Sequence, residues 1–151
     1  MPNFKGHVIG GLCAYAFVAV MLSAQHTSLV GHTIGLSATL AGALFPDIDT
    51  QSKGQRLYLK VLALILLMSL CLRAYIPLLF VLALFFSSFI MPHRGIFHDL
   101  WFISCVLVGI DICLLIAMPH RKVEILMASF FFLAGVLSHL LLDKGFRKTF
   151  R

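Results

Sequence analysis

The sequence predicts an all-α membrane protein, a polytopic bundle of about five to six short transmembrane or re-entrant helices. Of its 151 residues, 60% are hydrophobic, and the mean hydropathy is +0.99. Soluble domains average only about 45–50% apolar residues, so this chain needs lipid to cover its surface. The apolar residues gather in six runs separated by proline, glycine and charged residues. At this length we expect one domain, covering residues 1–151.

The six runs differ in whether they are long enough to cross a membrane. In order they are residues 8–24, 29–45, 57–72, 75–91, 100–118 and 123–142. A spanning helix needs about 20 residues, with about 17 as the lower limit, so the last two runs qualify and the middle ones are short. Run 29–45 contains His32 and several small residues, which leaves a re-entrant segment open as an alternative. Run 8–24 follows Lys5 but no small-residue cleavage site closes it, so we expect a retained helix and not a cleaved signal peptide.

The basic residues predict the orientation. If all six runs cross, nine of the twelve Lys and Arg residues lie on the side that carries both termini, and three lie on the other. The positive-inside rule places the richer side in the cytoplasm. Topology therefore accounts for the net charge of +6, and nucleic-acid binding is disfavoured. The four cysteines lie inside apolar runs without Cys-x-x-Cys spacing, which predicts buried free thiols.

Three short polar clusters interrupt the apolar chain, at residues 46–49, 93–99 and 138–143. An unpaired charge in apolar surroundings costs several kcal/mol, whereas imidazole and carboxylate together are ligands of divalent metals. The predicted threading brings all three clusters, and the early His7, to one face of the membrane. We therefore expect one metal site there, formed by His7, Asp47, Asp49, His93, His98, His139 and Asp143.

Three residues of these clusters are candidates for catalysis. The Arg94 guanidinium matches phosphate oxygens through its bidentate fork, although lipid-headgroup contact is an alternative. Asp49 or Asp99 would accept a proton, and Asp99 is also a weaker candidate ligand. We expect two or three divalent ions, zinc first, with manganese or iron as alternatives.

The three clusters together resemble the YdjM-like family of membrane-bound metal-dependent hydrolases. Family members carry Gly-x-Leu-x-Pro-Asp-Ile-Asp, His-Arg-Gly-x-Thr-His-Ser and Ser-His-x-x-x-Asp blocks, and this chain matches them at residues 42–49, 93–99 and 138–143. It departs at Phe97 and Asp99, which replace the family's Thr and Ser. The resemblance implies metal-dependent hydrolysis at the bacterial inner membrane. The order of His and Asp is also similar to that of zinc-dependent phospholipases C, a fold-level analogy only.

These observations favour a hydrolase that cleaves a phosphoester of a lipid headgroup at the cytoplasmic face. A metal or proton transporter is the first alternative, because intramembrane His and Asp often mark ion pathways. A non-catalytic scaffold stabilised by metal is the second. Asp111 lies about 18 Å along its helix from Asp99, too far for the metal site, and the sequence does not explain it.

Overall fold

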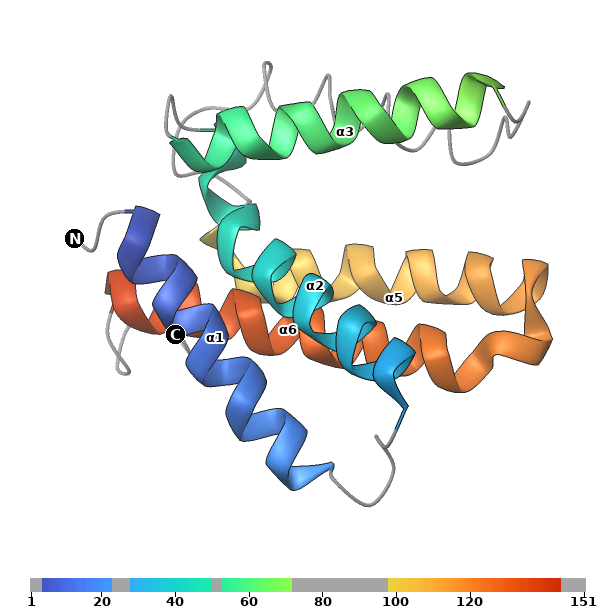
Figure 1. The fold of residues 1–151 in the computed structure, drawn as a ribbon, viewed down its shortest axis with the longest axis horizontal. Helices are drawn as coiled ribbons and strands as arrows, with labels where there is room; N and C mark the ends of the chain where they lie inside the picture. Colours follow the sequence, from blue (N-terminus) through green and yellow to red (C-terminus); the bar gives the residue numbers. More distant parts are fainter. Residues whose placement is uncertain (1–3, 23–27, 50–52, 72–97, 145–151) are drawn as a thin grey trace.

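The computed structural model of the chain describes residues 4–22, 28–49, 53–71 and 98–144. All regular structure in these ranges is helical, as Figure 1 shows. The α-helices are α1 (Phe4–Met21), α2 (Leu29–Leu44), α3 (Lys53–Cys71), α5 (Leu100–Ala117) and α6 (Lys122–Lys144), and the short 3-10 segments are η1 (Phe45–Asp49) and η3 (Pro119–Arg121).

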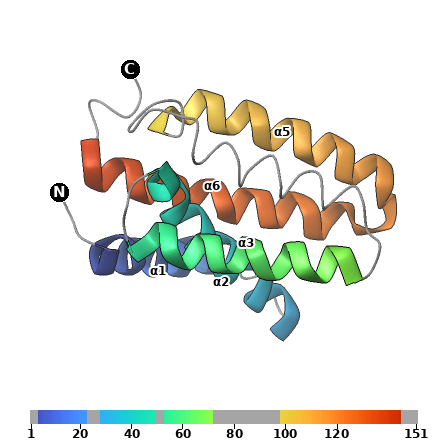
Figure 2. The same ribbon diagram turned by 90° about the horizontal axis from the view of Figure 1, so that it is seen from above.

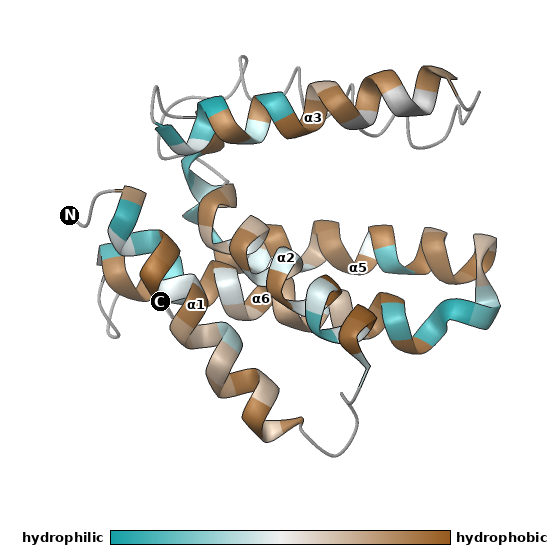
Figure 3. Cartoon of the chain, in the orientation of Figure 1, coloured by the Kyte–Doolittle hydropathy of each residue, from teal (hydrophilic) through white to brown (hydrophobic). Residues whose placement is uncertain are grey.

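The all-α membrane fold expected from the sequence is confirmed. Four stretches within the described ranges are long and apolar enough to cross a membrane: Phe4–Met21, Leu29–Ile48, Leu100–Ala117 and Pro119–Asp143. Run 29–45 thus reaches spanning length once η1 extends it. Run 75–91 lies outside the described residues. Figure 3 shows that the helices are mostly apolar and that hydrophilic residues occur at the starts of α1 and α3 and at the end of α6.

Helix ends follow local capping chemistry. The Ser28 side chain accepts a hydrogen bond from the Gly31 N–H at 3.0 Å and so begins α2. The Asp99 carboxylate accepts the Trp101 N–H at 2.9 Å and so begins α5. Each cap satisfies one of the amide groups that have no partner inside the helix. Pro119 stands at the first position of η3, where its missing N–H costs nothing.

Helices α2 and α6 cross with their backbones in direct contact. A Cβ atom added to Gly42 would lie 2.0 Å from the Phe132 carbonyl oxygen, and one added to Gly135 would lie 2.0 Å from the Thr39 carbonyl oxygen. Neither distance is possible for a real side chain, so both positions require glycine. Small residues permit this approach between membrane helices, where van der Waals packing drives association.

A small core lies beside this crossing. Phe45, Ile48, Leu62, Ile103, Val136 and Leu140 form one buried cluster contributed by η1, α3, α5 and α6. Outside it the surface is apolar: Trp101 and Ile116 on α5 are 76% and 78% exposed, a surface that suits lipid. The expectation of buried cysteines is wrong, because all four are free but exposed on this outer surface.

The helix ends that carry the polar clusters gather at one end of the bundle. In Figures 1 and 2 the starts of α1, α3 and α5 and the end of α6 all lie at the left. Segment η1 lies at the same end, directly after α2. The fold therefore brings His7, Asp47, His98 and Asp143 to one level of the molecule.

The crossing of α2 and α6 predicts the effect of two alanine substitutions. Gly135→Ala should force the helices apart, with a loss of about 1–3 kcal/mol typical of overpacking. Gly109→Ala on α5 is the matched control, because its Cβ would meet nothing within 4 Å. Alanine also favours the helix there by up to about 1 kcal/mol. The stabilities of both variants are measured by thermal unfolding in detergent. Equal melting temperatures for the two variants would contradict the close contact between α2 and α6.

Candidate metal centre

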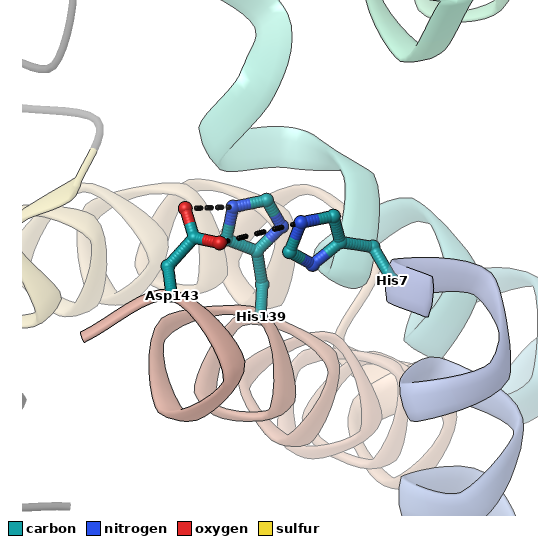
Figure 4. Close-up of side chains that lie close together, drawn as sticks. All are labelled: His7, His139 and Asp143. Carbon is teal, nitrogen blue, oxygen red and sulfur yellow. Dashed lines mark ion pairs between the residues drawn. The ribbon is translucent and has the colours of Figure 1, made fainter. Parts of the chain in front are cut away.

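Five polar side chains from four segments meet at this end of the bundle. His7 comes from the first turns of α1, Asp47 from η1, and His98 from the residues just before α5. His139 and Asp143 lie four residues apart on α6, a spacing that puts them on one helix face. Figure 4 shows His7, His139 and Asp143 directed toward one another.

The cluster is buried. His7, His98 and His139 are only 2%, 6% and 0% exposed. The side chain of Asp143 is 9% exposed and that of Asp47 is 21% exposed, so access from solvent is greatest at Asp47. Burial of this many ionisable groups is costly unless charge and hydrogen bonding compensate it.

The cluster's nitrogen and carboxylate atoms lie close together but beyond ordinary hydrogen-bond length. His7 Nε2 is 3.4 Å from Asp143 Oδ1. His139 Nε2 is 3.6 Å from Asp143 Oδ2 and 3.6 Å from Asp47 Oδ1. The His7 and His139 rings are stacked, with centroids 3.8 Å apart and planes at 15°, whereas the His98 and His139 rings lie 5.7 Å apart at 72°.

One hydrogen bond fixes the His139 ring. Its Nδ1 lies 2.7 Å from the Ala43 carbonyl oxygen, and because a carbonyl can only accept, Nδ1 carries the proton. Pro46 helps to leave this carbonyl available, because proline lacks the N–H that would close a 3-10 turn onto it. The Nε2 lone pair of His139 therefore points into the cluster, the arrangement common for metal-binding histidines.

The geometry fits a metal ion. Bonds of about 2.0–2.1 Å arranged as a tetrahedron place ligand atoms about 3.3–3.4 Å apart, close to the observed separations of 3.4–3.6 Å. His139 Nε2 and Asp143 Oδ1 are buried and make no hydrogen bond within the described part of the chain. Ligand atoms fall into two groups of three, each mutually within 4.8 Å: His7, His139 and Asp143, and Asp47, His98 and His139.

The remaining predicted site residues are placed as follows. Asp49 ends η1, two residues after Asp47, and its side chain lies outside the described part of the structure. His93 and Arg94 lie outside the described residues. Asp99 is exposed, and its carboxylate caps α5, so the structure gives it a structural role next to His98.

Two polar pairs that sequence reasoning did not find lie elsewhere in the bundle. Ser129 donates a hydrogen bond to Asp111 Oδ1 at 2.6 Å, which links α5 to α6 and accounts for the unexplained Asp111. The Tyr15 hydroxyl and His32 Nδ1 are 2.9 Å apart, which links α1 to α2. The members of each pair are 17 or 18 residues apart, a separation that no local motif records.

The fold and this cluster define a helical integral membrane protein with a buried histidine–carboxylate centre at one end of its helices. The chain belongs to the YdjM family of inner membrane proteins, whose pattern it matches over residues 1–146. No curated protein and no solved structure is significantly similar to it.

Metal uptake should stabilise the protein through His139. An ion that binds only the folded state raises the melting temperature, by an amount that grows with the ratio of its concentration to Kd. We expect Zn²⁺ to raise the melting temperature of the chelator-treated protein, and His139→Ala to abolish the shift. Asp99→Ser is the control, because serine also caps a helix and the shift should persist. A His139→Ala protein with the full zinc shift would exclude this centre.

Proposed function

We propose that the protein is a membrane-embedded metal-dependent hydrolase that cleaves a phosphoester of a lipid headgroup at the cytoplasmic face. The observation that carries the proposal is the buried centre around His139, whose nitrogen and carboxylate atoms have the spacing of metal ligands. Its place at the ends of apolar helices supports a lipid substrate, because headgroup bonds lie at this level of a bilayer.

The cluster and two further residues, Arg94 and Asp49, would have different roles in such a reaction. Histidine and aspartate side chains of the cluster would hold the ion, which supplies an activated water and polarises a phosphoryl oxygen. Arg94 would bind the phosphate oxygens through its planar fork and stabilise negative charge in the transition state. Asp49 would accept the proton, since the Asp99 carboxylate is engaged in capping α5.

Access to the centre supports cytoplasmic chemistry. Asp47 is the most exposed of the five clustered side chains described above, so a headgroup would approach from its side. Nine of the twelve basic residues fall on the side of the polar clusters when the chain crosses six times, the bias of a cytoplasmic face.

The distribution of polar groups favours hydrolysis over transport. A transport pathway needs polar groups at intervals across the membrane. The pairs Tyr15–His32 and Asp111–Ser129 belong to different helix pairs, and each is joined by its own hydrogen bond. The concentration of His and Asp at one end is the pattern expected of interfacial chemistry.

Purified protein loaded with Zn²⁺, Mn²⁺ or Fe²⁺ and mixed with a panel of phospholipid vesicles provides the test. We expect metal-dependent release of phosphate or of a phosphorylated headgroup, which a chelator stops and re-addition of metal restores. Metal-loaded protein that releases neither from any lipid would instead support the scaffold alternative. Uptake of the ion into the lumen of proteoliposomes would support transport.

Substitution of Arg94 and substitution of His139 should have different effects on metal content and activity. Arg94→Ala should leave metal content unchanged while activity falls about 10²–10³-fold, the scale of one lost transition-state donor. Arg94→Lys should restore only part of the activity, because an ammonium group cannot reproduce the bidentate geometry of the guanidinium. His139→Ala should lose metal and activity together. Metal content and lipid hydrolysis are measured on the same samples, and a fully active Arg94→Ala protein would remove the arginine from the mechanism.

A further inference from the structure

We propose that a single ion is bound by Asp47, His98 and His139, and that His7 and Asp143 are positioning residues behind it. This inference rests on the metal site of the proposed function and divides its five clustered side chains into two roles. The division follows from one hydrogen bond and from the relative orientation of three imidazole rings.

The first step is that the cluster has room for one ion at His139. Both groups of candidate ligands contain His139, and its Nδ1 is engaged with the Ala43 carbonyl. Only Nε2 is left to bind metal, and one lone pair binds one ion. The two groups are therefore alternatives, not two occupied sites. This differs from the two or three ions that the sequence led us to expect.

The second step is that His98 and His139 can converge on one ion. A bond of about 2.0–2.1 Å places the ion roughly 3.2 Å from an imidazole centroid, so tetrahedral binding separates two centroids by about 5.2 Å. The observed separation is 5.7 Å, with the ring planes at 72°. Small side-chain movements would close the difference, because the two rings already stand at a steep angle.

The third step is that His7 and His139 cannot both bind one ion. Their centroids are 3.8 Å apart, which would require a nitrogen–metal–nitrogen angle of roughly 75°, below even the 90° of an octahedral site. Their planes are also nearly parallel, at 15°, so an ion in the plane of one ring lies far out of the plane of the other. A stacked pair of imidazoles cannot bind one ion through both lone pairs.

In this arrangement the His7–Asp143 pair holds the His139 ring in place and does not bind the ion. His7 covers one face of the His139 ring, while the Ala43 carbonyl holds its edge, so the ring keeps one plane and one direction. The 3.4 Å ion-pair contact with Asp143 holds His7 in turn. Catalytic zinc sites have three protein ligands and an open fourth position. Asp47 is the most exposed of the five side chains, so water or substrate would reach such a position from its side.

The same substitution at two of the three buried histidines, His7 and His98, tests the division. His7→Phe keeps an aromatic ring against His139 but removes both nitrogens, and we expect one Zn²⁺ per chain with Kd raised at most about 10–100-fold. His98→Phe should raise Kd more than about 100-fold, beyond the range of losses seen for outer partners. Zinc is measured by mass spectrometry and competition with a chelator, after circular dichroism has confirmed the helical content of each variant.

X-ray absorption at the zinc edge of the unmodified protein gives a reading that does not depend on variants. We expect one ion per chain with two imidazole ligands. Two ions per chain, three imidazoles, or equal zinc loss in His7→Phe and His98→Phe would each overturn the inference. An unmodified protein that binds none of Zn²⁺, Mn²⁺ and Fe²⁺ would overturn the proposed function with it, whereas zinc bound through His7 would overturn the division alone.

Discussion

The close crossing of α2 and α6 is the contact on which the centre depends. Only the absence of side chains at Gly42 and Gly135 lets the two backbones meet. The contact brings α6 near enough for His139 to donate to the Ala43 carbonyl at 2.7 Å. Without that bond the ring could turn, and the direction of its second nitrogen would no longer be defined. A packing feature of two apolar helices thus determines the orientation of a polar side chain.

Because the cluster is buried, the orientation of the His139 ring matters for ion binding. In a low-dielectric interior a carboxylate without a compensating charge is costly, and the same surroundings strengthen its interaction with a cation. The cluster contains Asp143, whose side chain is only 9% exposed, and three buried histidines that carry charge only when protonated. A divalent ion would compensate the carboxylates without protonating the imidazoles. The apolar helices around the cluster therefore favour ion binding as well as membrane insertion.

Much of this arrangement could be predicted from the sequence, because apolar runs, proline breaks and the four-residue spacing of His139 and Asp143 are local patterns. Helices α1 and α3 begin four residues before their apolar runs, at Phe4 and Lys53, since hydropathy marks only the part of a helix that meets lipid. The contacts that orient the side chains of the centre are not local in the sequence. A backbone acceptor such as the Ala43 carbonyl has no residue type to reveal it, and an aspartate that caps a helix looks the same in sequence as one that binds metal.

The single ion that we propose would have a consequence for the proposed hydrolysis. In a two-metal site the second ion stabilises the leaving oxygen of the phosphoryl group. A single divalent ion bound by one carboxylate, Asp47, retains one net positive charge, which a phosphodiester already neutralises. The further negative charge of the transition state then needs a cation from the protein. Arg94 lies in the same motif as His98, four residues before it, and an arginine there would supply this charge with the bidentate geometry that phosphate oxygens require.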